Sequence, residues 1–181
     1  MHYDIAIIGY GPVGAVTANL FGQKGFNTIV IEPKKEIWDI PRAVHFDGQT
    51  QRIFQTMGFM DEISKIIHPM EGINFLNNKG KSIVNINLKL DEPINGYDES
   101  VFFNQPIFER FLRSEAIKHK NIDIKLGYKL TDIEARQSIN NLILLNTNNE
   151  EEYVTCDYVL ACDGANSFVR KALNIESFDY K

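Results

Sequence analysis

The chain has 181 residues, of which 44% are hydrophobic and 24% are charged, and its formal net charge at pH 7 is −5. These values are ordinary for a globular protein. They argue against a disordered chain, a disulfide-dense miniprotein and a basic surface for nucleic acid. No apolar run approaches the roughly 18 residues of a membrane span. The two cysteines, Cys156 and Cys162, lack metal-ligand spacing. We therefore expect a cytoplasmic protein that uses no metal, membrane or nucleic acid.

The first 32 residues predict a strand, a helix and a second strand. Asp4–Ile8 is a short, mostly apolar run, typical of a strand buried on both faces of a parallel sheet. A helix is expected from Val13 to about Lys24, and Gly25 then occupies a suitable C′ position. Thr28–Ile31 is a second apolar strand and is followed by Glu32. Together these elements predict a βαβ unit with a right-handed crossover.

The remainder of the chain continues to alternate predicted helices and strands, as in an α/β protein. The predicted elements are a helix at Gln49–Met57, a turn at Asn77–Gly80, a half-buried strand at Val84–Leu90, a helix at Pro106–Lys118, a strand at Ile122–Leu126, a hairpin loop at Asn146–Glu152 and a helix at Asn166–Leu173. The all-apolar run Tyr158–Ala161 predicts another buried parallel strand. We expect a single domain, 1–181, with an inserted β-rich segment at about 72–104.

The strongest functional signal is the spacing Gly9-x-Gly11-x-x-Gly14 between the first strand and the first helix. In such a motif the first glycine permits a tight turn, the second lets the backbone approach a pyrophosphate, and the third lets the helix pack closely on the strand. The N–H groups and dipole at the helix N-terminus then face the anion. The motif predicts a dinucleotide site, and a glycine-rich turn without a ligand is the alternative.

Glu32 strengthens this interpretation because it lies 18 residues beyond Gly14 and ends the second predicted strand. A carboxylate at that point can accept hydrogen bonds from both hydroxyls of a ribose. It would also repel a 2′-phosphate. The alternative is that Glu32 is simply solvated.

Four motifs occur in order along nearly the whole chain. They are the glycine motif with Glu32, Pro41-Arg42-Ala43-Val44-His45-Phe46-Asp47, Asn104-Gln105-Pro106, and Cys162-Asp163-Gly164-Ala165-Asn166-Ser167-x-Val169-Arg170. Together they resemble the FAD-dependent aromatic-ring monooxygenases of the para-hydroxybenzoate hydroxylase class, especially the meta-hydroxyphenylpropionate hydroxylase branch. The resemblance implies an α/β fold: a Rossmann-like FAD-binding βαβ with a parallel sheet, plus an added antiparallel β-hairpin region.

The resemblance also implies which residues bind the cofactor. Besides the three glycines and Glu32, the motif positions Pro12, Val13 and Pro33 fall in the predicted FAD site. Many relatives place an arginine where this chain has Pro33, so Lys34 or Lys35 is the candidate substitute for that contact.

Four further residues match positions with family roles. Arg42 matches an arginine that approaches the FAD phosphates and flavin edge, and Gln105 matches a glutamine near the ribityl chain. Asp163-Gly164 matches a motif linked to both FAD and the nicotinamide cofactor. From the sequence alone, Arg42 could instead be a surface arginine, Gln105 a helix-start residue and Asp163 a cap of the following helix.

By this resemblance, NAD(P)H reduces FAD and O2 supplies the oxygen that is transferred to a small phenolic substrate. No residue can be assigned as a catalytic acid or base. Relatives continue for hundreds of residues beyond the position of Lys181, so we expect a later strand and the substrate domain to be absent and the chain alone to be inactive. The alternatives are a non-catalytic FAD- or nucleotide-binding fragment and an NAD-dependent oxidoreductase.

A final expectation concerns self-association. The segment Tyr158–Cys162 contains no charge and no proline, the features that commonly protect an exposed sheet edge. We therefore expect the chain to form a homodimer, or to aggregate, through this edge.

Overall fold

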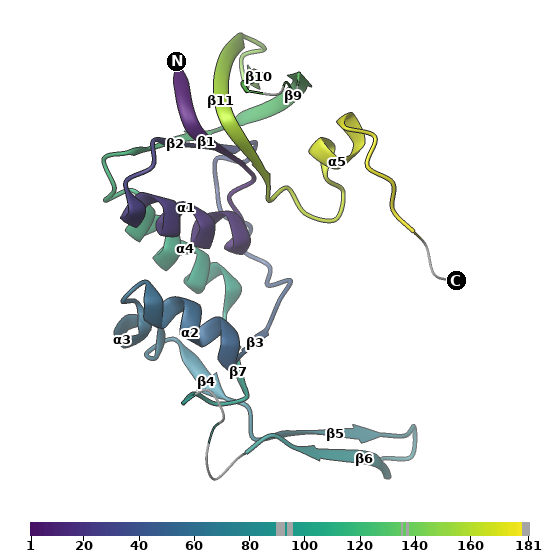
Figure 1. Cartoon of the computed structure of the whole chain (residues 1–181). Coiled ribbons are helices and arrows are strands. Elements are labelled where there is room, and N and C mark those ends of the chain that lie inside the picture. Colours follow the sequence, from purple (N-terminus) through teal and green to yellow (C-terminus); the bar gives the residue numbers. More distant parts are fainter. Residues whose placement is uncertain (90–92, 94–95, 135, 137, 179–181) are drawn as a thin grey trace. The chain divides into compact units, whose positions relative to one another are not determined.

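The computed structural model describes residues 1–89, 93, 96–134, 136 and 138–178. The chain divides into two compact units (Figure 1). The sheet unit comprises Met1–Ile37 and Glu109–Lys181, and the middle unit comprises Trp38–Phe108. Helix α4 (Gln105–Ala116) begins in the middle unit and ends in the sheet unit. None of the helices in the described residues has both the length and the apolar character of a membrane-spanning segment.

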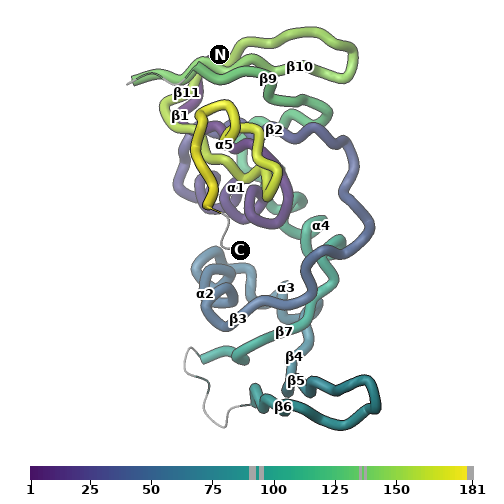
Figure 2. The backbone as a smooth tube through the Cα atoms, turned by 90° about the vertical axis from the view of Figure 1, so that its right-hand side faces the viewer, coloured from purple at the N-terminus to yellow at the C-terminus, as the bar shows by residue number. Residues whose placement is uncertain are grey.

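The sheet unit is built on six strands in the order β8-β2-β1-β11-β10-β9. Their bounds are β1 (His2–Ile8), β2 (Thr28–Glu32), β8 (Ile122–Leu126), β9 (Tyr128–Glu134), β10 (Asn140–Asn146) and β11 (Glu151–Ala161). Strands β8, β2, β1 and β11 are parallel, whereas β9, β10 and β11 form an antiparallel meander whose strands lie beside one another in Figure 2. The predicted combination of a parallel sheet with an antiparallel region is confirmed.

The predicted βαβ unit is formed by β1, α1 (Pro12–Lys24) and β2. Gly25 ends α1 with φ 81°, in the left-handed region that favours glycine, and its N–H reaches back to Gly22. Every residue of β2 is buried, as expected of an inner parallel strand. This arrangement places the loop between β1 and α1 at the carboxyl edge of the sheet, where α/β proteins bind their ligands.

A hydrophobic core of the sheet unit joins the parallel strands to the meander. It includes helix α5 (Phe168–Ala172), which contributes Val169. Its buried members are Tyr3, Ala6, Ile8, Ile29, Ile31, Leu130, Ile133, Leu142, Leu144, Val154, Cys156 and Val169. Because this core spans β9 to β11 and β1 to β2, it fixes the carboxyl ends of β1, β2 and β11 relative to one another.

The expectation for Tyr158–Ala161 is half right. These residues do pair in parallel with β1, with Ile5 opposite Tyr158. They are not a separate buried strand, because they form the end of the eleven-residue β11, and Tyr158 is 70% exposed. The reason is that β10 pairs with β11 only as far as Cys156, so that beyond this point the described residues supply a strand partner on the β1 side alone.

The middle unit contains a three-stranded antiparallel sheet in the order β3-β7-β4 and a separate two-stranded hairpin. Its elements are β3 (His45–Asp47), α2 (Gly48–Thr56), α3 (Met60–Ile63), β4 (Ile67–Pro69), β5 (Gly72–Leu76), β6 (Ser82–Asn87) and β7 (Ser100–Phe103). Four phenylalanine rings, those of Phe46, Phe54, Phe103 and Phe108, pack at centroid distances of 5.0–5.7 Å. This aromatic cluster is the core on which α2 and the start of α4 rest.

The predicted half-buried strand at Val84–Leu90 corresponds to β6, but the prediction that it is half-buried is wrong. All six residues of β6 are exposed, including Val84 and Ile86. The alternation is real, since both apolar side chains pair across the hairpin with apolar residues of β5. Within the described residues, however, the hairpin forms a sheet of two strands only. Leu90 lies outside the described residues.

Candidate functional site

Two of the three glycines, Gly9 and Gly11, lie in the loop between β1 and α1, and Gly14 lies in the first turn of α1. Gly9 and Gly14 are required by the fold itself. Gly9 has φ 99°, and a Cβ built on it would lie 2.5 Å from the carbonyl oxygen of Cys162. A Cβ on Gly14 would collide with the carbonyl oxygen of Gly9. The tight turn and the close helix–strand packing expected at these positions are therefore present.

Gly11 differs from both of these glycines. Its φ is −72°, which any residue adopts, and a Cβ built on it meets no described atom within 4 Å. It is the N-cap of α1, and the helix has Pro12 at its start, no side-chain cap and no acidic residue in its first turn. Val13 in that turn is 67% exposed. The N-terminus of α1 thus presents uncapped N–H groups on an open side, which suits an anion.

Glu32 ends β2 beside this loop, and its side chain is directed back toward it. Only 9% of Glu32 is exposed. Its Oε2 accepts a hydrogen bond from the N–H of Tyr10 at 2.8 Å, and its Oε1 accepts one from the N–H of Lys34 at 3.0 Å. A carboxylate has about four acceptor positions, so two remain for the hydroxyls of a ribose.

The residues after Glu32 bear on whether Lys34 or Lys35 could replace the arginine that many relatives have at the position of Pro33. Pro33 is exposed and has no cationic group. The side chain of Lys35 lies over the turn between β8 and β9, where a Cβ on Gly127 would come within 2.9 Å of it. Lys35 is therefore directed to this turn, whereas Lys34 lies two residues after Glu32 and donates its backbone N–H to the Glu32 carboxylate.

Asp163 and Gly164 follow β11 and lie next to the glycine loop. The N–H of Cys162 donates to the carbonyl of Ile8 at 2.8 Å, which joins the ends of β11 and β1. Asp163 Oδ2 accepts from the N–H groups of Phe168 at 2.7 Å and Val169 at 3.2 Å at the start of α5, close to its alternative interpretation, but the N-cap residue of this helix is Ser167. The Oδ1 of Asp163 is buried and has no hydrogen-bond partner among the described residues.

Arg42 and Gln105 are brought together in the middle unit. Gln105 is 4% exposed, and its Oε1 accepts hydrogen bonds from the N–H groups of Arg42 and Ala43, both at 2.8 Å. The glutamine therefore orients the backbone of the loop that carries the exposed Arg42. The predicted site residues thus fall into two groups, one in each unit: Arg42 and Gln105 here, and the glycines, Glu32 and Asp163 in the sheet unit.

Sequence reasoning missed Arg113 and Glu109, which lie on α4 beside the glycine loop. The Nε and Nη2 of Arg113 donate to the carbonyl of Tyr10 at 3.1 and 2.6 Å, and the guanidinium lies 4.5 Å from the centre of the Tyr10 ring. Burial raises the pKa of Tyr10 to about 12, with Arg113 opposing the shift. The available signal was the i,i+4 spacing of Glu109 and Arg113, which indicates an ion pair but not its position.

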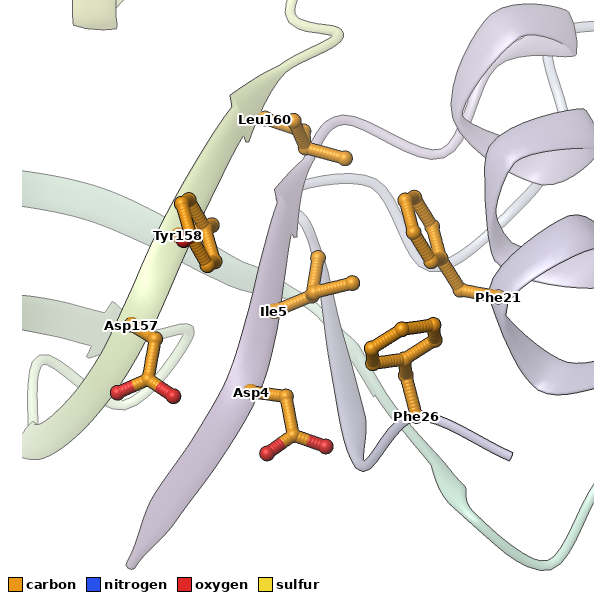
Figure 3. A pocket seen from close by; sticks show the side chains of 7 residues that line it. All are labelled: Asp4, Ile5, Phe21, Phe26, Asp157, Tyr158 and Leu160. Carbon is orange, nitrogen blue, oxygen red and sulfur yellow. The ribbon is translucent and has the colours of Figure 1, made fainter. Parts of the chain in front are cut away.

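A hollow of about 460 Å³ lies elsewhere in the sheet unit (Figure 3). Its lining residues are Asp4, Ile5, Phe21, Phe26, Asp157, Tyr158 and Leu160. Asp4 and Ile5 belong to the amino-terminal half of β1, whereas the glycine loop follows the carboxyl end of that strand. This apolar hollow is therefore distinct from the dinucleotide site.

A βαβ unit with three glycines of this geometry and an acidic residue ending its second strand defines a dinucleotide-binding α/β protein. Residues 2–181 match the FAD-binding domain family, and the chain belongs to this family.

Curated relatives agree with this assignment. The chain is 32% identical over 172 residues to the 3-(3-hydroxy-phenyl)propionate/3-hydroxycinnamic acid hydroxylase 2 of Burkholderia vietnamiensis, covering 95% of this chain and 31% of that protein. The identity to the corresponding hydroxylase of Escherichia coli K12 is 30%, with the same coverage. The chain thus spans about a third of the length of these relatives.

Solved structures show the same fold. The p-nitrophenol 4-monooxygenase PnpA of Pseudomonas putida superposes with a TM-score of 0.89 at 22% identity, covering 98% of this chain and 45% of that one. The flavin-dependent monooxygenase PieE, solved with FAD and substrate, gives a TM-score of 0.87 at 20% identity and covers 97% and 32% of the two chains. The expected FAD-binding fold is confirmed.

Proposed function

We propose that this chain binds FAD and is the FAD-binding part of an enzyme that hydroxylates a small phenolic or related aromatic substrate with NAD(P)H and O2. The observation that carries the proposal is the open, uncapped N-terminus of α1 at Gly11, beside the carboxylate of Glu32, in a chain of the FAD-binding domain family. The activity of the curated hydroxylases supports the reaction class.

The residues present fit the adenosine diphosphate half of FAD. The N–H groups at Gly11, Val13 and Gly14 would hold the pyrophosphate, and Glu32 would hold the ribose. Gly11 provides the cradle, because a Cβ there would occupy open space that a phosphate can fill.

Each unit, taken by itself, contains candidate residues for the flavin half. Arg42 supplies a forked cation for anionic oxygens, and Gln105 fixes the loop that carries it. Asp163 and Gly164 follow β11 next to Gly9 and complete the set, with Pro12 and Pro33 as flanking positions. Bound FAD would supply the redox and oxygen chemistry, while these residues bind and orient it.

The setting we propose for this reaction is the cytoplasm. Both Cys156 and Cys162 are free thiols, as is usual in a reducing compartment. Burial raises the pKa of Cys156 to about 11, which keeps this thiol protonated and unreactive at neutral pH.

The test is the flavin content of the purified chain after incubation with FAD and desalting. We expect flavin absorbance bands at close to one FAD per chain, displaced by excess ADP and not by riboflavin. A colourless chain that also fails to take up added FAD would contradict the proposal and favour a fragment without cofactor. Uptake of NAD in preference to FAD would favour the nicotinamide alternative.

A further inference from the structure

The backbone of Tyr10, between the first two glycines of the loop, is held from two sides. Its N–H donates to Glu32 Oε2 at 2.8 Å. Its carbonyl oxygen accepts two hydrogen bonds from Arg113, which lies 103 residues further along the chain, at 3.1 Å from Nε and 2.6 Å from Nη2. Two side chains on different elements thus fix both polar groups of one residue.

These hydrogen bonds to Tyr10 determine the direction of the N–H group of Gly11. The peptide bond between Tyr10 and Gly11 is trans and planar, so the Tyr10 carbonyl and the Gly11 N–H point in opposite directions. Because Arg113 holds the carbonyl on one side, the Gly11 N–H is turned to the other. It donates to no acceptor among the described residues, and it belongs to the one glycine of the motif whose Cβ position is open.

The surroundings of Arg113 indicate that it acts through geometry rather than through net charge. Its side chain is only 12% exposed and faces the carboxylate of Glu109, itself 3% exposed, at 3.8 Å. The acid offsets most of the field that the guanidinium would exert on a distant anion. What remains specific to arginine is a planar fork that donates twice to one carbonyl while it stacks on the ring of Tyr10.

We infer that Arg113 is a positioning residue of the dinucleotide site: it holds the Tyr10 carbonyl so that the Gly11 N–H faces the pyrophosphate. The inference rests on the proposed function and deepens it, because it names the residue on which the preference for a pyrophosphate-bearing ligand depends. Because adenosine has the ribose but no phosphate, its affinity should not depend on Arg113.

The experiment compares ADP with adenosine in the whole chain and in its Arg113→Met variant, with affinities measured by calorimetry or NMR titration. We expect ADP to bind about tenfold more weakly to the variant, the effect of losing one oriented donor to a charged acceptor. Adenosine should bind both proteins equally. Lys118→Met is the matched control, because Lys118 also pairs with a nearby acid, Glu115, but is 66% exposed. This variant should bind both ADP and adenosine with wild-type affinity.

Arg113→Lys separates geometry from charge and serves also if Arg113→Met does not fold. Lysine retains the positive charge but lacks the planar fork, so we expect the same selective loss of ADP affinity. Wild-type ADP affinity in Arg113→Lys would show that charge suffices and would overturn the inference. Equal weakening of ADP and adenosine binding would overturn it too, since that indicates a general loosening of the site.

If the wild-type chain binds neither ADP nor FAD, the proposed function fails and the inference fails with it. If it binds both and Arg113→Met binds ADP normally, the inference alone fails.

Discussion

At the scale of single residues, the three glycines of the motif occupy two kinds of environment. Gly9 and Gly14 are enclosed by backbone, at the end of β11 and at Gly9 itself, so that any side chain there would disturb the fold. Gly11 faces open space in a backbone conformation available to every residue. A substitution at Gly11 therefore separates binding from folding, which neither of the other two positions permits.

Glu32 is expected to contribute more to adenine-dinucleotide affinity than its neighbour in sequence, Glu36. Glu32→Ala should weaken FAD binding by about 1.5–3 kcal/mol, the range for hydrogen bonds to a charged group. Part of this loss would come from release of the Tyr10 N–H, which Glu32 also holds. Glu36 is exposed beyond the end of β2, and Glu36→Ala should be near neutral. Equal affinities of the two variants in calorimetry would remove Glu32 from the site.

The sequence predicted the site residues that act within a local motif and missed those that act through space. The turn at Gly9 and the packing at Gly14 follow from spacing alone, because strand, turn and helix are consecutive. Arg113 could not be found in this way, since its contact with Tyr10 spans 103 residues and depends on where α4 packs. The hydrogen bond from Tyr10 to Glu32 is a further contact that spacing could not specify.

At the scale of elements, α2 illustrates how one side chain defines a helix start. Asp47 is its N-cap, and its Oδ1 accepts a hydrogen bond from the N–H of Thr50 at 2.8 Å. Asp47→Ala should lower the free energy of unfolding by roughly 0.5–2 kcal/mol, as is typical for the loss of a cap. Asp47→Asn should retain most of the stability, because asparagine caps helices as well as aspartate does. Chemical denaturation of both variants is the measurement, and equal loss in both would contradict a capping role.

The same residue gives a pH dependence with a defined sign. The hydrogen bonds from Thr50 lower the pKa of Asp47 below its ordinary value of 3.8. The folded state therefore favours the ionised form, and the associated stability is present above pH 4 and is lost as the pH falls through the lowered pKa. The Asp47→Asn variant should lack this component of acid destabilisation.

Some elements whose pattern lies within one segment were predicted well, and several short paired strands were not. Helix α1 and strand β8 were predicted to within one residue at each end, because a single segment carries the whole pattern. Strands β3, β4 and β7 were missed, since each has three or four residues and exists through pairing with a distant segment. Exposure was the weakest expectation: β6 alternates as a half-buried strand does, but only its hairpin partner covers it in the described residues.

At the scale of the whole molecule, the open edge of β11 is the feature most relevant to self-association. The described residues place no strand beside Tyr158–Ala161 on the side away from β1. Tyr158 is 70% exposed at this edge and lines the apolar hollow of Figure 3. An uncharged edge of this kind can pair with a second copy of the chain. The homodimer expected from the sequence stays a prediction.

We expect light scattering to show an average mass that rises with protein concentration, and Tyr158→Lys to suppress this rise. Lysine at an exposed edge position disfavours strand pairing without entering the core. Tyr153→Lys is the matched control: Tyr153 lies on the same strand and is 66% exposed, but its edge is already paired with β10. A wild-type chain that stays monomeric at high concentration, or equal effects of the two variants, would contradict association through this edge.

The central claim, that the loop around Gly11 holds the pyrophosphate of FAD, is tested most directly by calorimetric titration of the Gly11→Val variant with FAD. Because a side chain at Gly11 meets no described atom within 4 Å, the variant should fold with a thermal midpoint near that of the wild type. Its added side chain would occupy the space of the phosphates, and we predict that FAD binding is lost or weakened by at least about tenfold. Wild-type affinity in the folded variant would contradict the claim, since the phosphates would then have to bind elsewhere.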